Sequence, residues 1–104
     1  MNNKNNNFDN KCYQKLTQIP EGMVSTYAEI AKSLNTKAYR AVGNAMAKNP
    51  NLILIPCHRI LKSDGTIGGY VLGTNKKIEL LKNEGILIKD GKVINLESKL
   101  YRFN

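Results

Sequence analysis

Signals for two short helices joined by a tight turn constrain the fold of this chain more than any other feature of its sequence. Residues 26–29 match the S/T-x-x-E capping box and predict a helix over 26–34. Residues 35–36 form a turn, and a second helix is expected over 37–48. Asn49-Pro50 ends it, because the residue before a proline is pushed out of the α region. The pattern predicts a helix-turn-helix, although any two-helix corner has the same signals.

The remaining segments add short elements around this motif. Apolar residues at three- to four-residue spacing predict a helix over 9–18, and a further helix is expected over 74–84. Asp90-Gly91 predicts a β-hairpin over 86–94, and the apolar run 51–55 indicates a buried strand or extended segment. The expected fold is mainly α with small β elements: a winged helix-turn-helix-like domain with a C-terminal β-hairpin.

The chain is long enough for one small domain. It has 104 residues, which allow one modest core. Residues 1–7 are polar and rich in asparagine, so we expect a disordered tail there and the folded domain over 8–104. A membrane span is not expected, because no run of about 18 apolar residues occurs. Two cysteines without a signal segment favour a reducing, cytoplasmic setting.

Positive charge is concentrated in one part of the chain. The net charge is +8, and the window 30–63 contains six cations and no carboxylate. A basic block of this kind favours a polyanionic partner, nucleic acid first. A lysine-rich surface that is merely solvated explains the same composition, so charge alone does not decide between the two.

The second predicted helix is built from small residues. Ala41, Gly43, Ala45 and Ala47 leave its surface thin, and a glycine inside a helix costs up to about 1 kcal/mol relative to alanine. Close approach to another backbone explains Gly43, and that backbone belongs either to nucleic acid or to a neighbouring protein segment. With Arg40 as its one arginine, the helix favours sequence-independent binding in the minor groove over base reading in the major groove.

The run Pro56-Cys57-His58-Arg59 carries the candidate chemistry. A thiol reacts as its thiolate, and a neighbouring imidazole and arginine are groups that lower a thiol pKa. Adjacent residues in an extended segment point to opposite sides, so the pair alone is weak evidence for a nucleophile and its base. Cys12 lies on the apolar stripe of the first helix and is expected in the core. These cysteines and His58 are too few for a four-ligand zinc site, so no metal is expected.

Six motifs occur in a fixed order along residues 8–84. They are Ile19-Pro20-x-Gly22, Thr26-Tyr27-x-x-Ile30-Ala31, Arg40-Ala41-Val42-Gly43, Asn49-Pro50, Pro56-Cys57-His58-Arg59 and Leu80-Leu81-x-x-Glu84. In this order and spacing, the chain resembles the C-terminal catalytic domain of O6-alkylguanine-DNA alkyltransferases, also called methylated-DNA–protein-cysteine methyltransferases. Many members of that family carry another domain before this one.

The resemblance implies a DNA repair reaction in which a cysteine irreversibly takes the alkyl group of an extruded O6-alkylguanine. Cys57 would be the acceptor nucleophile, His58 its base acting through a water molecule, and Glu84 the group that orients His58. Asn49 would brace the turn before the active-site segment. Tyr27 would hydrogen-bond the extruded guanine and donate a proton as it leaves.

Further residues are implied for DNA and for the substrate pocket. Arg40 would fill the gap left in the base stack. The implied DNA-contacting set is Thr26, Lys37, Tyr39, Arg40, Ala41, Gly43 and Asn44. The implied substrate pocket is Tyr27, Pro56, Tyr70, Val71 and Leu72. Many relatives have small residues where Val71 and Leu72 stand, so we expect Leu72 to narrow the pocket and to favour O6-methylguanine over bulky adducts.

The implied partner is double-stranded DNA, bound in the minor groove with little sequence specificity. The reaction is single-turnover and needs no cofactor or metal, and we expect a monomer in the cytoplasm, at the nucleoid when bound to DNA. Three alternatives stay open. A non-catalytic alkyltransferase-like protein would flag lesions for another pathway; that group usually has tryptophan in place of the cysteine, and Cys57 argues against it. The second alternative is a sequence-specific transcription regulator, but the second helix has few side chains that could read base edges. The third is a cysteine hydrolase, for which no oxyanion-hole motif is present in the sequence.

Overall fold

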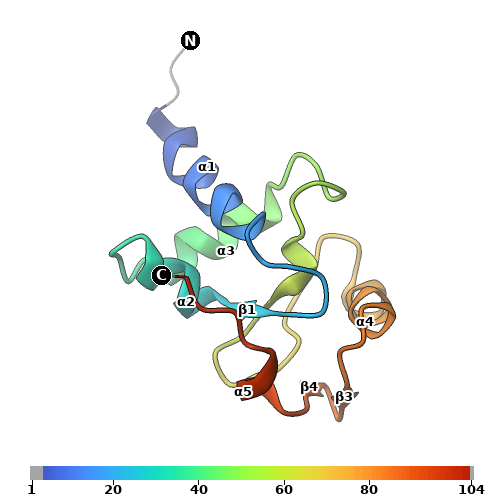
Figure 1. Ribbon diagram of the computed structural model, residues 1–104. Coiled ribbons are helices and arrows are strands. Elements are labelled where there is room, and N and C mark those ends of the chain that lie inside the picture. Colours follow the sequence, from blue (N-terminus) through green and yellow to red (C-terminus); the bar gives the residue numbers. More distant parts are fainter. Residues whose placement is uncertain (1–3, 104) are drawn as a thin grey trace.

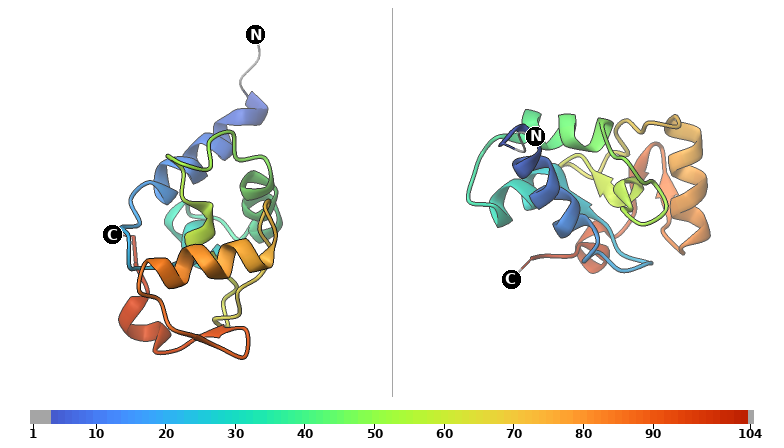
Figure 2. Two further views of the ribbon diagram at one scale, coloured as in Figure 1. Left: turned by 90° about the vertical axis from the view of Figure 1, so that its right-hand side faces the viewer. Right: turned by 90° about the horizontal axis from the view of Figure 1, so that it is seen from above.

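A short parallel sheet lies between two groups of helices in the computed structural model, which describes residues 4–103 (Figures 1 and 2). Strand β1 (Ser25–Thr26) pairs with β2 (Ile60–Leu61), with Ser25 opposite Ile60. One group consists of α1 (Lys4–Leu16), α2 (Tyr27–Ser33) and α3 (Tyr39–Ala47). The other contains α4 (Thr74–Asn83), the hairpin of β3 (Ile88–Lys89) and β4 (Lys92–Val93), and α5 (Leu96–Lys99). The 3-10 helix η1 (Cys57–Arg59) leads directly into β2.

Each group has its own hydrophobic cluster. The larger cluster joins the first three helices to η1 and β2. It contains Cys12, Tyr13, Leu16, Ile19, Ile30, Ala31, Val42, Ala45, Met46, Cys57 and Ile60. The smaller one fills the space under α4 and the hairpin and contains Val24, Leu61, Ile67, Leu81, Ile86 and Val93. Adjacent residues Ile60 and Leu61 of β2 thus belong to different clusters, because successive side chains of a strand point to opposite faces.

The predicted helix-turn-helix is confirmed as α2 and α3. The hydroxyl of Thr26 accepts a hydrogen bond of 3.1 Å from the Glu29 backbone N–H, so Thr26 caps α2 as the sequence predicts. The tyrosine hydroxyl of Tyr13 donates to the Ala45 carbonyl at 2.8 Å and ties α1 to α3. The expected fold class, mainly α with small β elements, is therefore confirmed.

The predicted C-terminal hairpin is also confirmed. Asp90 and Gly91 have φ values of 53° and 76°, the left-handed pair that a two-residue turn of this twist requires. After α5 the chain returns to the first group of helices, where the Tyr101 N–H donates to the Val24 carbonyl at 2.7 Å. The ring of Tyr101 then packs against the larger cluster.

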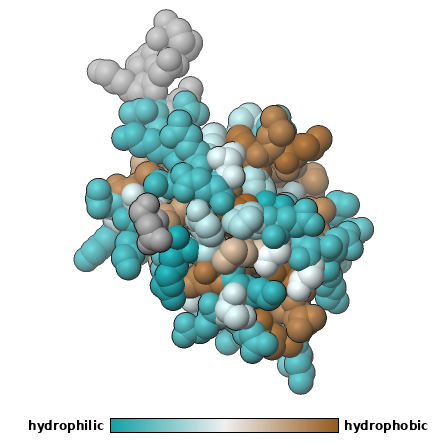
Figure 3. Space-filling model, viewed as in Figure 1, coloured by the Kyte–Doolittle hydropathy of each residue, from teal (hydrophilic) through white to brown (hydrophobic). Residues whose placement is uncertain are grey.

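The run 51–55, expected as a buried strand or extended segment, is instead an exposed loop of turns. The side-chain oxygen of Asn51 accepts the N–H groups of Ile53 and Leu54, each at 3.1 Å, and this local bonding replaces strand pairing. Ile53 is 90% exposed and Leu54 70% exposed. Figure 3 shows a hydrophobic patch at the upper right of the molecule, where Figure 1 draws the loop that follows α3.

The first helix starts earlier than the expected range 9–18. It spans Lys4–Leu16, so residues 4–7 of the segment expected to be a tail are helical, and residues 1–3 lie outside the described part of the chain. Within residues 4–103, no helix is both long enough and apolar enough to cross a membrane.

Candidate functional site

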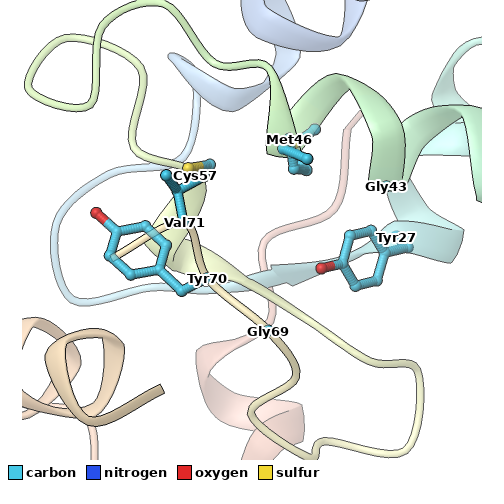
Figure 4. Close-up of a pocket in the computed structure, with 8 residues that line it drawn as sticks. Tyr27, Gly43, Met46, Cys57, Gly69, Tyr70 and Val71 are labelled. Atoms are coloured by element: carbon cyan, nitrogen blue, oxygen red, sulfur yellow. The ribbon is translucent and has the colours of Figure 1, made fainter. Parts of the chain in front are cut away.

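Cys57 opens onto a cavity of about 270 Å³ between α3, η1 and the glycine-rich loop 68–73. Its lining residues are Tyr27, Gly43, Met46, Ala47, Cys57, Gly69, Tyr70 and Val71. In Figure 4 the hydroxyl of Tyr27 points across the cavity toward the side where Cys57 and Tyr70 lie. The volume is close to the lower end of the range of about 300–1,000 Å³ for small-ligand pockets, which suits a compact ligand such as a purine base.

Asn49 holds the turn that delivers Cys57 to this cavity. Its side-chain amide donates to the Ile55 carbonyl at 2.8 Å, and its oxygen accepts the Asn51 N–H at 2.8 Å. The Cys57 N–H donates to the same Ile55 carbonyl at 2.8 Å. Asn49, just after α3, and Cys57 therefore both bind the carbonyl of Ile55. This is the bracing position that the resemblance implies for Asn49.

His58 and Glu84 form a buried pair behind Cys57. Nε2 of His58 lies 2.8 Å from Oε2 of Glu84, and the two side chains are 9% and 12% exposed. With Nε2 donating to the carboxylate, Nδ1 carries the lone pair of the ring. Nδ1 is buried and has no hydrogen-bond partner among the described residues, so it is available to accept a proton.

Arg59 is not the group that activates Cys57, and this sequence-based expectation is wrong. Its guanidinium donates to both oxygens of Glu84, at 2.9 and 2.8 Å, and to the Ile19 carbonyl at 2.8 Å. Burial opposes ionisation of Glu84, but the hydrogen bonds and charges of Arg59 and His58 outweigh it and hold the pKa of that carboxyl below its usual range. Arg59 therefore keeps Glu84 ionised and oriented.

Lys77, which was not predicted as a site residue, is the cation whose charge acts on the Cys57 thiol. This residue of α4 is 0% exposed, and its ammonium donates to the Gly69 carbonyl at 3.0 Å. Burial lowers the pKa of Lys77 to about 8, while negative charge on Cys57 acts in the opposite direction. A lysine on a helix is normally expected to be solvated. The sequence feature that could have indicated a role for Lys77 is its spacing of seven residues from Glu84, which places both on the same face of the helix.

The Cys57 thiol has a raised pKa. Burial raises the pKa, and the hydrogen bond from Asn49 and the positive charge of Lys77 pull it down without cancelling that effect. The thiol is therefore held protonated in the resting protein, which makes a nearby base necessary for its reaction.

The implied pocket residues divide into those that line the cavity and those that do not. Tyr27, Tyr70 and Val71 line it, and the rings of Tyr70 and His58 meet edge-on with centroids 6.5 Å apart. Pro56 is buried, and neither Pro56 nor Leu72 is among the residues that line the cavity. Of the two loop residues, Val71 is the one that lines it, and narrowing of the pocket by Leu72 stays a prediction.

The implied DNA-contacting residues lie mainly on the outer surface of α3 and its preceding turn. Lys37, Tyr39, Arg40 and Asn44 are exposed, and Ala41 is half-buried. Thr26 differs from them, because it is 4% exposed and its hydroxyl caps α2.

Gly43 lines the cavity without being needed for packing within the protein. A Cβ built on Gly43 meets no atom within 4 Å among the described residues. For Gly43, the alternative of tight contact with a neighbouring protein segment is therefore wrong, whereas Ala45 of the same helix is buried in the larger cluster. The space beside Gly43 opens instead to the cavity and to a neighbouring groove.

The six cations of the basic window separate into two kinds. Arg59 bonds to Glu84, and Lys48 pairs with Asp9 at 2.8 Å. The remaining four line hollows on the surface around α2 and α3: Lys32, Lys37, Arg40 and Lys62. Within residues 4–103, no three His, Cys, Asp or Glu side chains group closely enough to hold a metal ion.

The family is decided by a match of the DNA binding domain of 6-O-methylguanine DNA methyltransferase to residues 7–86. The chain belongs to this family. It is 46% identical over 93 residues to a bifunctional methyltransferase/endonuclease of Picrophilus torridus, covering 88% of this chain and 30% of that protein. It is 45% identical over 84 residues to the methylated-DNA–protein-cysteine methyltransferase of Sulfolobus acidocaldarius, covering 81% of this chain and 53% of that one. The chain thus spans about half the length, or less, of these curated alkyltransferase relatives.

Among solved structures, the chain resembles S. pombe Atl1 in complex with damaged DNA containing O6-carboxymethylguanine. The TM-score is 0.82 at 30% identity, and the match covers 94% of this chain and 97% of Atl1. The fold is therefore that of the DNA-binding domain shared by alkyltransferases and Atl proteins, and DNA repair is the setting of the family.

Proposed function

We propose that this protein binds duplex DNA containing O6-alkylguanine, extrudes the damaged base and transfers its alkyl group to the sulfur of Cys57 in a single turnover. The observation that carries the proposal is the position of Cys57 at a base-sized cavity, directly beside a His58–Glu84 pair whose free ring nitrogen is buried. On this proposal the chain contains the catalytic part of the family's longer proteins.

The reaction replaces one proton on sulfur by one alkyl group. The thiol proton passes through a water molecule to Nδ1 of His58, and the sulfur then attacks the alkyl carbon. The S–C bond forms as the C–O6 bond breaks, and the electron pair of that bond goes to guanine. Tyr27 donates a proton to the departing base and becomes a phenolate. The proton held by His58 then returns through solvent to Tyr27, so the net products are a thioether and neutral guanine.

The charges around the cavity support this sequence of proton transfers. Burial and the neighbouring Cys57 raise the pKa of Tyr27, which keeps its phenol protonated and able to donate. The Lys77 ammonium stabilises negative charge on Cys57 at the moment the thiolate forms. Glu84, kept ionised by Arg59, stabilises the imidazolium that His58 becomes.

The exposed side of α3 supports binding in the minor groove. Its thin surface at Gly43 faces the cavity, and Arg40 lies one helical turn earlier, where it can fill the gap left by the extruded base. We propose that the protein binds with little sequence specificity, acts as a monomer and works in the cytoplasm.

The test is intact-mass analysis and peptide mapping after incubation of the reduced protein with duplex DNA containing one O6-methylguanine. The expected result is one added methyl group, located on Cys57, with no further turnover. The Cys57→Ser variant is expected to bind the same duplex and to gain no methyl group. An unmodified Cys57 in folded, reduced protein after prolonged incubation contradicts the proposal.

A second candidate function is recognition of alkylated bases without transfer. It is favoured by the match to S. pombe Atl1, which extends over nearly the whole of both chains. The same mass experiment separates the two functions, since a recognition protein binds the methylated duplex more tightly than the unmodified one and its sulfur stays unchanged.

A further inference from the structure

A groove of about 580 Å³ lies next to the Cys57 cavity. The groove is lined by Tyr27, Ala28, Tyr39, Arg40, Gly43, Lys62 and Ser63, and it shares Tyr27 and Gly43 with the cavity. We call it the Tyr39 groove. Its volume falls within the range of about 300–1,000 Å³ that small-ligand pockets occupy.

Tyr39 is one of the residues that line this groove. It is the first residue of α3 and is 50% exposed. It also lines a further hollow of about 540 Å³, together with residues of α2 and the turn. Tyr39 thus borders two hollows and has a large part of its surface open. An exposed tyrosine ring offers a rigid stacking platform with few rotatable bonds.

The charge of the groove suits a polyanion. Arg40 and Lys62 are cations, and the described residues that line the groove include no carboxylate. The nearby carboxylate of Asp64 is already engaged, because the backbone N–H and the hydroxyl of Thr66 donate to it at 3.0 and 2.8 Å. An aromatic platform beside two cations is the arrangement that binds an unpaired nucleotide, base on ring and phosphate on cation.

The path from the cavity to the groove is short and open. Gly43 separates the two, and a Cβ at this position has no neighbour within 4 Å among the described residues. A DNA strand whose extruded base fills the cavity continues through this gap. The next unit of the strand then reaches Tyr39.

We propose that the Tyr39 groove binds the nucleotide adjacent to the extruded one on the same DNA strand, with its base stacked on the Tyr39 ring and its phosphate held by Lys62. This rests on the proposed function, because it assumes that a base occupies the cavity. Tyr39 thereby acts as a second wedge beside Arg40 and opens the strand by two nucleotides.

The test uses duplexes that contain O6-methylguanine and a single 2-aminopurine, placed 5′ or 3′ of the lesion or, as a control, opposite it. All measurements are made in the Cys57→Ser background, so that binding is separated from transfer. Binding is expected to change the fluorescence of one flanking probe, and Tyr39→Ala is expected to abolish that change and weaken binding about tenfold, as loss of one base–aromatic stack does. Tyr39→Phe keeps the aromatic ring and is expected to retain both the fluorescence change and the binding affinity.

Lysine substitutions test the phosphate contact. Lys62→Ala is expected to lower the slope of log affinity against log salt concentration by about one unit, the value for one phosphate contact. Lys89→Ala on the hairpin is expected to leave the slope unchanged. The proposal is overturned if neither flanking probe responds to binding, or if Tyr39→Ala binds as tightly as its background protein.

A different experiment tests the proposed function separately from the Tyr39 groove. Free O6-methylguanine is expected to enter the cavity without using the groove, so its reaction with the parent protein tests Cys57 alone. A protein that reacts with neither the free base nor the duplex refutes alkyl transfer, while affinity and fluorescence still decide whether Tyr39 binds the neighbouring nucleotide.

Discussion

Arg59 grips the carboxylate of Glu84 through two hydrogen bonds, Nε to Oε1 at 2.9 Å and Nη2 to Oε2 at 2.8 Å. The same Oε2 lies 2.8 Å from Nε2 of His58, so the orientation of the imidazole depends on a residue that does not touch the cavity. A planar guanidinium can hold both oxygens at once, which a lysine ammonium on a flexible stem cannot.

Arg59→Lys is therefore expected to slow alkyl transfer while leaving DNA affinity near that of the parent. The carboxylate loses its fixed orientation, and we expect the transfer rate to fall about tenfold or more, by analogy with the loss of groups that orient metal-binding histidines. The measurement is the single-turnover rate of transfer from methylated duplex, beside the affinity of the Cys57→Ser form. Arg102→Lys, which alters an exposed pair with Glu29, is the control and is expected to react at the parent rate.

Lys77→Met is expected to slow transfer at neutral pH. The variant removes the cation that favours the Cys57 thiolate, so the pKa of the thiol rises further and less thiolate is present. Raising the pH should restore part of the lost rate. Lys76→Met, which changes the exposed neighbouring lysine, is the matched control. A variant that reacts as fast as the parent at neutral pH shows that Lys77 has no part in forming the thiolate.

The same variant is expected to change how stability depends on pH. The folded pKa of Lys77 is about 8 and the unfolded value is 10.5, so over this interval the unfolded chain binds more protons and burial of Lys77 becomes less costly as pH rises. The free energy of unfolding of the parent should gain up to about 3 kcal/mol over that interval relative to Lys77→Met. Cys12 has the opposite effect, because its pKa is raised to about 11 in the folded protein and the free energy of unfolding therefore falls as pH rises. This contribution is the same in the parent and in Lys77→Met, so it cancels in the comparison. Urea unfolding at several pH values gives the difference between them.

Features encoded in a few consecutive residues could be predicted, and features that depend on distant partners could not. The Thr26 cap and the Asp90-Gly91 turn are set by local backbone chemistry, and both are present. The run 51–55 forms turns and no strand because Asn51 accepts the N–H groups that follow it, which the apolar character of the run does not reveal. That outcome reflects competition between a side chain and strand pairing.

The site shows the same division. The adjacency of Cys57 and His58 is visible in the sequence, but the partner of Arg59 lies 25 residues away and the role of Lys77 depends on burial under the 68–73 loop. A lysine and an arginine look alike as charges in a basic chain. Only packing decides that one bonds to Glu84 and the other stands near the thiol.

Gly43→Ala is expected to stabilise the protein and to weaken its function. Alanine in a helix interior gains about 1 kcal/mol over glycine, and the new methyl group meets no protein atom. The methyl group instead occupies space that the base and its strand need, so DNA affinity and transfer should both fall. Asn10→Ala on the exposed face of α1 is the control for added helix stability, with transfer at the parent rate. A Gly43→Ala protein that is more stable and fully active shows that the thin surface serves no ligand.

Val71, rather than Leu72, is expected to set the largest alkyl group that the cavity accepts, because Val71 lines the wall and Leu72 does not. Val71→Ala should raise the rate with O6-benzylguanine relative to O6-methylguanine about tenfold, on the scale expected for removing methyl groups from the apolar lining of a pocket. Leu72→Ala should leave that ratio near its parent value, since Leu72 is not among the lining residues. Competitive labelling with both substrates measures the ratio directly. If Leu72→Ala shifts the ratio and Val71→Ala does not, the loop 68–73 closes over the bound base in an arrangement that brings Leu72 inward, and the size limit belongs to that residue.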